Sequence, residues 1–92
     1  MKLIPGFLME FILPKENTTI YLTKGFSGEK NNLFLKVVHS NRDIKLFWYV
    51  DETFIGTTQS IRDMEILAKK GVHLITVIDE FGNEIRREIK IK

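Results

Sequence analysis

The chain has no cysteine among its 92 residues and only two prolines. The disulfide framework that stabilises many small secreted domains is therefore excluded, as is a zinc site built on thiolates. No apolar run approaches the roughly 20 residues that a membrane-spanning helix needs, so we expect no direct membrane insertion. At this length we expect one domain that is stabilised by packing alone.

No excess of one charge sign is present either. The sequence has 14 basic and 12 acidic residues, which gives a net charge of +2. Basic residues gather late in the chain, but Glu84 and Glu88 interleave with Arg86, Arg87 and Lys90. A nucleic-acid-binding surface is normally more one-sided. We interpret this segment as a solvated strand face and expect no nucleic-acid partner.

The residues that are present favour β-structure. Hydrophobic residues make up 43% of the chain, which is enough for a core, and Val, Ile, Thr, Phe and Tyr alternate with frequent turn residues. The pattern predicts an all-β, immunoglobulin-like antiparallel β-sandwich of about seven strands. A helical turn over 61–68 stays open as an alternative to a strand. The expected strands are 10–13, 17–22, 33–38, 44–50, 54–55, 64–67, 71–78 and 85–91.

The first residues do not fit this pattern. Lys2 precedes a short apolar run that Pro5 and Gly6 interrupt, and no small-residue cleavage site follows. We interpret residues 1–9 as a linker or a cloning remnant, and we expect the immunoglobulin-like domain to span 10–92.

Alternation along the strands predicts which side chains form the core. Lys36 and Lys45 mark outward positions, so their neighbours of opposite parity face inward. A tryptophan in the middle of an apolar strand is typical of such a core. Arg87 falls on an inward position, and we expect it to lie near the rim and reach solvent. The expected core anchors are Trp48, Leu35, Val37, Ile75 and Val77.

The same alternation predicts an apolar outer surface. Phe47 and Tyr49 on one strand, and Leu74 and Ile78 on another, should point away from the core. These two strands are neighbours in immunoglobulin-like sandwiches, so the four side chains should form one patch. A contiguous exposed apolar patch often marks an interface. The alternative is that β-propensity alone places aromatic residues on open strands.

The ordered pattern of these segments resembles a known family. It consists of Trp48-Tyr49-Val50-Asp51, then Ile55-Gly56, then Gly71-x-His73-x-Ile75-x-Val77-x-Asp79-x-x-Gly82. This order resembles the C-terminal domain of bifunctional (class A) penicillin-binding proteins of the 1C type, over about residues 10–92. One position departs from the pattern, because Glu52 stands where we expect glycine. We therefore expect a longer loop or a bulge there.

The resemblance implies a context and no chemistry. In such proteins a membrane-anchored glycosyltransferase domain polymerises peptidoglycan and a penicillin-binding domain follows it. This implies an accessory, non-catalytic domain on the periplasmic or extracytoplasmic side of the envelope. The implied partners are the other domains of the same polypeptide or an envelope protein. None of the family's catalytic residues can be placed on this sequence.

Local motifs support no catalytic, metal or cofactor site. Ser27 and Lys30 match the S-x-x-K spacing of penicillin-recognising enzymes, but nearby glycines disfavour the helix that this motif requires. His39 and His73 lie on different expected strands, and a metal needs three or four converging ligands. We interpret His73 as a partly buried, hydrogen-bonded residue near a strand entry. The carboxylates of Asp79, Glu80 and Glu84 are interpreted as solvated hairpin charges.

A glycan-binding module is the alternative function. Exposed aromatic rings can stack on sugars when amides and carboxylates lie nearby. Tyr49 is a candidate glycan contact as well as a member of the predicted apolar outer surface. A free-standing adhesion-type sandwich would differ only in its genetic context. The further candidate glycan contacts are Phe54, Phe81, Asn83 and Asp79.

Overall fold

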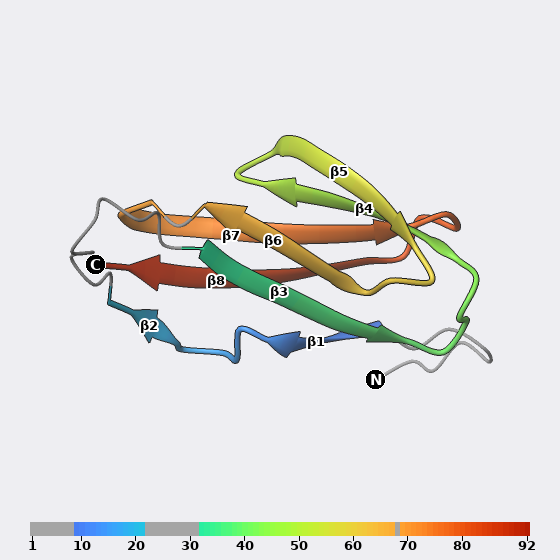
Figure 1. Cartoon of the computed structure of the whole chain (residues 1–92), viewed down its shortest axis with the longest axis horizontal. Helices are drawn as coiled ribbons and strands as arrows, with labels where there is room; N and C mark the ends of the chain where they lie inside the picture. Colours follow the sequence, from blue (N-terminus) through green and yellow to red (C-terminus); the bar gives the residue numbers. More distant parts are fainter. Residues whose placement is uncertain (1–8, 22–31, 68) are drawn as a thin grey trace.

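The computed structural model describes residues 9–21, 32–67 and 69–92. These residues form eight β-strands and no helix, which confirms the predicted all-β class (Figure 1). The strands are β1 Met9–Leu13, β2 Thr19–Ile20, β3 Asn32–His39, β4 Lys45–Val50, β5 Thr53–Gln59, β6 Asp63–Leu67, β7 Gly71–Asp79 and β8 Glu84–Ile91.

The strands form two sheets that pack as a sandwich. One sheet has the order β1-β3-β6, and the larger one has the order β2-β8-β7-β4-β5. The pairings are antiparallel, as predicted, except that β2 lies parallel to β8. The strands expected at 44–50 and 71–78 were predicted to be neighbours. This is confirmed, because β4 pairs directly with β7.

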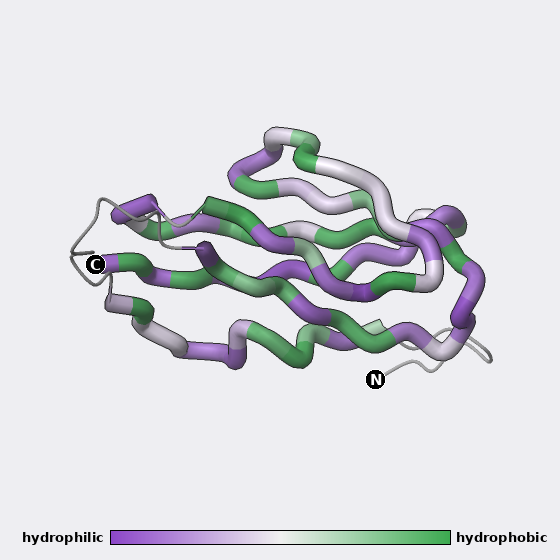
Figure 2. Tube along the Cα trace, viewed as in Figure 1, coloured by the Kyte–Doolittle hydropathy of each residue, from purple (hydrophilic) through white to green (hydrophobic). Residues whose placement is uncertain are grey.

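The core lies between the sheets and is built by strict alternation. Along β8, Figure 2 shows hydrophobic positions separated by hydrophilic ones, as expected for a strand with one buried face, whereas β7 is hydrophobic at most positions. Trp48 lies opposite Gly56 on β5 and Val77 on β7, and its Nε1–H donates a 2.9 Å hydrogen bond to Thr58 Oγ1. The side chains exposed by no more than 1% include Trp48, Leu35, Val37, Ile75 and Val77.

Two strands differ from the sequence-based expectation. The segment at 63–67 is the strand β6, so the helical turn considered over 61–68 is wrong. The strand expected to end at Ile55 continues as β5 to Gln59. Thr57 and Thr58 are β-branched and pair with Phe47 and Leu46. Their polar side chains look loop-like in sequence, yet they suit a strand at the edge of a sheet.

The β4–β5 connection is a tight turn and not a longer loop. Val50 pairs with Thr53, so the turn consists of Asp51 and Glu52, whose φ angles are 50° and 70°. Positive φ at both central residues is typical of a type I′ hairpin turn. The register irregularity lies further along, where Ile55 is inserted between the pairs Tyr49↔Phe54 and Trp48↔Gly56. The expected bulge is therefore present, but inside β5 and not at Glu52.

Two further expectations concern the edges of the domain. Met9 is part of β1 and is only 8% exposed, so it belongs to the β-sandwich and not to the predicted linker; residues 1–8 lie outside the described part. Arg87 reaches the rim, as predicted, and its Nη1 lies 3.4 Å from Glu16 Oε1. Its guanidinium carbon lies 5.3 Å from the centre of the Phe11 ring, so the side chain bridges β8 and β1.

Candidate functional site

The outer face of the large sheet brings the predicted interface residues together. Phe47 on β4 pairs with Ile78 on β7, and Tyr49 pairs with Thr76. Leu74 lies at the end of this row, where its carbonyl accepts a hydrogen bond from the Asp51 N–H. These four side chains are half-buried and not fully exposed. Their positions on the two paired strands place them on one face of the sheet.

Phe54 extends the same face onto the edge strand β5. It pairs with Tyr49, and the two rings meet edge to face with centroids 5.5 Å apart and an angle of 62°. Its side chain is 53% exposed. Phe54 was predicted only as a candidate glycan contact, because a longer loop or a bulge was expected at Glu52. The two-residue turn of Asp51 and Glu52 instead pairs Phe54 with Tyr49 on the outer face. We call the set Phe47, Tyr49, Phe54, Leu74 and Ile78 the outer patch.

Charged residues of β8 border the outer patch. Arg86 Nη2 lies 2.8 Å from Glu84 Oε2, and both residues lie beside the apolar row because they pair with Thr76 and Ile78. A shallow groove of about 400 Å³ runs between the patch and this border. The face therefore has an apolar centre and a charged rim on one side. Its groove is lined by Tyr49, Glu52, Thr76, Ile78, Glu84 and Arg86.

Asp79 is not on the surface, which corrects its prediction as a glycan contact. It is 2% exposed, and its Oδ1 accepts hydrogen bonds of 2.9 Å from the backbone N–H groups of Phe81 and Asn83. Its Oδ2 accepts one from the Asn83 side-chain amide, also at 2.9 Å. Asn83 is therefore committed to this internal network. Of the candidates at the β7–β8 turn, Phe81 alone is well exposed, at 66%.

His39 completes this network from the other sheet. Its Nε2 lies 2.9 Å from Asp79 Oδ2, and both side chains are fully buried. His39 Nδ1 accepts a hydrogen bond from the Asn41 N–H, so Nε2 must carry the proton that is donated to Asp79. Burial raises the pKa of Asp79, but hydrogen bonds from His39, Asn83 and Phe81 outweigh this and leave the pKa below its ordinary value of 3.8.

His73 is hydrogen-bonded near the entry of β7, as predicted. Its Nδ1 lies 2.6 Å from Asp51 Oδ2, and its Nε2 lies 2.8 Å from the Lys69 carbonyl oxygen. Both partners are acceptors, so both ring nitrogens must donate and the ring is an imidazolium. The hydrogen bond to Asp51 raises the pKa of His73, and the hydrogen bond from His73 lowers the pKa of Asp51. Gly71 permits this geometry, because its φ of 127° is rarely accessible to other residues.

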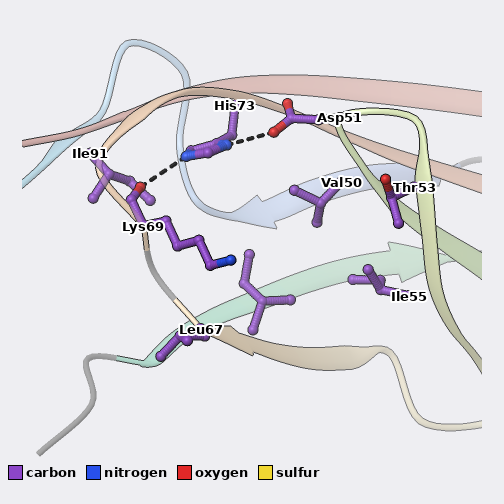
Figure 3. A pocket seen from close by; sticks show the side chains of 9 residues that line it. Val50, Asp51, Thr53, Ile55, Leu67, Lys69, His73 and Ile91 are labelled. Atoms are coloured by element: carbon purple, nitrogen blue, oxygen red, sulfur yellow. Dashed lines mark hydrogen bonds and ion pairs between the residues drawn. The ribbon is translucent and has the colours of Figure 1, made fainter.

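A pocket of about 440 Å³ lies beside this ion pair, between the two sheets (Figure 3). Aliphatic side chains of the large sheet, including Val50 and Ile55, face Ile66 and Leu67 of β6 across it. We call it the end pocket. No local sequence pattern predicts it, because its walls come from five strands and two connections that only the strand order brings together. Its lining residues are Val50, Asp51, Thr53, Ile55, Ile66, Leu67, Lys69, His73 and Ile91.

Other predicted features lie elsewhere. Ser27 and Lys30 lie outside the described residues. In the described part of the chain, no group of three or more His, Asp or Glu side chains is placed to hold a metal ion. Nothing in residues 9–21, 32–67 and 69–92 folds into a helix with the length and apolar character needed to span a bilayer.

Comparisons with known proteins give one family and one fold. The model of the penicillin-binding protein C-terminus family matches residues 8–91. Among solved structures, one described as the fibronectin(III)-like modules of Clostridium thermocellum CbhA is similar to this chain. The match has 21% sequence identity and a TM-score of 0.68, and it covers 92% of this chain and 97% of the other. At that identity the likeness shows a shared β-sandwich fold alone. No curated protein matches the chain.

Proposed function

The chain belongs to the penicillin-binding protein C-terminus family, and we propose that it is a non-catalytic accessory domain that docks through its outer patch. The family match over residues 8–91 is the observation that carries the accessory role. The implied parent is a bifunctional peptidoglycan synthase anchored in the membrane. The domain would then act on the periplasmic or extracytoplasmic side, with the synthase's catalytic domains or an envelope protein as its partner.

The contiguity of the outer patch supports its choice as the docking surface. Phe47 meets Ile78 across one strand pair, and Tyr49 meets Phe54 across the next, so no charge interrupts the apolar centre. An apolar centre with a charged border is the common anatomy of protein interfaces.

The opposite sheet also exposes apolar side chains, but charges interrupt them. Phe34 is 60% exposed, and its cross-strand partner is Glu65. Val38 is 39% exposed, and its partner is Glu10. Apolar residues scattered in this way are normal on a protein surface and mark no interface. This contrast favours the outer patch over the face of β1-β3-β6.

A non-catalytic role agrees with the chemistry of the described titratable pairs. Asp79 and His39 are fully buried, and each is held by internal hydrogen bonds. Asp51 and His73 also bind one another, and the second ring nitrogen of His73 is hydrogen-bonded to the Lys69 carbonyl oxygen. Incubation with a labelled penicillin should leave the domain, including Ser27, unmodified.

The docking proposal is tested by the double substitution Tyr49→Ser and Leu74→Ser. Neither side chain belongs to the buried core, so the domain should stay folded. Central aromatic anchors often contribute about 2 kcal/mol or more to binding, so association with the catalytic domains should weaken measurably in pull-down or sedimentation experiments.

A matched control uses the opposite sheet. The double substitution Phe34→Ser and Leu67→Ser removes two side chains that are 60% and 45% exposed, and it should leave binding unchanged. If the two double variants weaken binding equally, or if only the control does, the outer patch is not the docking surface.

A glycan-binding module is the second candidate, favoured by the exposure of two aromatic rings. Phe81 is 66% exposed on the β7–β8 turn, and Phe54 is 53% exposed beside Tyr49. The outcome that would establish this function has two parts. Phe81→Ala or Phe54→Ala would abolish binding to purified glycan strands, while the Tyr49→Ser and Leu74→Ser variant would bind its protein partner normally.

A further inference from the structure

The end pocket is a separate feature from the outer patch. It lies between the sheets, whereas the outer patch lies on the far side of β4 and β7. Its volume of about 440 Å³ falls within the usual range of small-molecule sites, which is roughly 300 to 1,000 Å³. Most of its wall consists of aliphatic side chains, and three charged residues lie at its margin: Asp51, Lys69 and His73.

The charges at the margin are not equivalent. Asp51 and the His73 imidazolium are joined at 2.6 Å and largely neutralise each other. Lys69 contributes its carbonyl oxygen to His73, but its ammonium group forms no ion pair with any described residue. In Figure 3 its side chain extends away from His73 toward the middle of the pocket. The pocket therefore presents one uncompensated positive charge beside an aliphatic wall.

We propose that the end pocket binds a small molecule with an apolar body and a terminal carboxylate. The apolar part would lie against Ile55, Ile66 and Ile91, and the carboxylate would pair with the Lys69 ammonium. An amine would be disfavoured, because the Lys69 ammonium repels a cation. A neutral analogue would keep the apolar contacts and lose the ion pair. The site is additional to the proposed docking function and shares none of its outer-patch residues.

The proposal is tested with three probes that share one aliphatic chain. Isotope-labelled protein of the full 92 residues is titrated with sodium octanoate, 1-octanol and octylamine, and backbone amide shifts are followed by NMR. Octanoate should give saturable shifts at Ile55, Ile66 and Ile91. Octanol should bind more weakly at the same residues, and octylamine should bind least.

Two lysine variants separate the pocket charge from general basicity. Lys69→Met should weaken octanoate binding about fivefold, which is the range expected for a solvent-accessible ion pair, and should leave octanol binding unchanged. Lys70→Met is the matched control, because Lys70 is the next residue and does not line the pocket. This control should bind octanoate as the wild type does. Circular dichroism confirms that each variant is folded.

Either of two results would overturn the proposal. One is the absence of saturable octanoate shifts at the pocket residues of the folded wild-type protein. The other is equal loss of octanoate binding in the Lys69→Met and Lys70→Met variants. Both results leave the docking proposal untouched, because none of these changes alters the outer patch. Conversely, failure of the Tyr49→Ser and Leu74→Ser test leaves the end pocket intact.

Discussion

Asp51 and His73 form a 2.6 Å ion pair that ties the β4–β5 turn to the start of β7. The same carboxylate accepts a 2.8 Å hydrogen bond from the Leu74 N–H, and the Asp51 N–H donates to the Leu74 carbonyl at 2.9 Å. Asp51 thus continues the pairing of β4 with β7 through a residue with positive φ. This single side chain helps to hold both the turn and one wall of the end pocket.

This ion pair should make stability depend on pH. The pKa of His73 is raised above its ordinary value of 6.5, so its contribution is full below that pH and is lost as the pH rises through the folded-state pKa. The pKa of Asp51 is lowered below 3.8, so its contribution is present above that pH and is lost on acidification. The pair should therefore contribute most between pH 3.8 and pH 6.5.

Asp51→Asn tests this dependence, because asparagine can still accept the hydrogen bond from Leu74. The gap in melting temperature between wild type and variant should be large at about pH 5.5 and should shrink by about pH 9. Thermal melts at both pH values measure it. If the gap in melting temperature stays constant over this pH range, the ion pair with Asp51 does not raise the pKa of His73.

Asp79 should be sensitive to substitution, because four hydrogen bonds hold its buried carboxylate. Asp79→Ala removes the acceptor of the hydrogen bonds from His39 and from the N–H groups of Phe81 and Asn83, and the loss of hydrogen bonds to a buried carboxylate is costly. We expect a loss of about 3 kcal/mol in the free energy of unfolding. Denaturant melts measure this loss, with Glu88→Ala as an exposed control. A loss no larger than that of the control would contradict the network.

Replacement of Glu52 by glycine should increase the stability of the domain. Its φ of 70° disfavours any residue with a Cβ, so Glu52→Gly should stabilise the domain by about 0.5 to 1 kcal/mol. Gly82→Ala is the reciprocal test. Gly82 has a φ of 86° and open space around its Cβ position, so any destabilisation reports backbone strain alone. Denaturant melts should move in opposite directions for the two variants, and movement in the same direction would refute the argument.

Trp48 should be the main core anchor. It is fully buried between β5 and β7, and its indole N–H is satisfied by Thr58. Trp48→Ala should cost about 3 to 5 kcal/mol, a large share of the stability of a small domain. Trp48→Phe should cost less, because it keeps most of the apolar volume. An alanine variant that melts near the wild-type temperature would contradict this role.

Alternation made much of the fold predictable. The parity of Lys45 placed Trp48 inside and Phe47 outside, and Lys36 did the same for Leu35 and Val37, because side chains of successive strand residues point to opposite faces. Alternation also predicts two buried polar residues that the sequence-based core did not include. His39 continues the inward row of Leu35 and Val37, and Asp79 continues that of Ile75 and Val77, so both side chains face the core.

The sequence by itself determined the fold class, the two faces of each long strand and the family, because these depend on short-range patterns. Only the tertiary structure decided which polar groups meet. His39 and Asp79 are 40 positions apart, and Asp51 and His73 are 22 apart. Their contacts depend on strand order and register, which no local pattern specifies. The pairing of Phe54 with Tyr49 likewise depends on the two-residue turn of Asp51 and Glu52, because a shift of one position would move its side chain to the other side of the sheet.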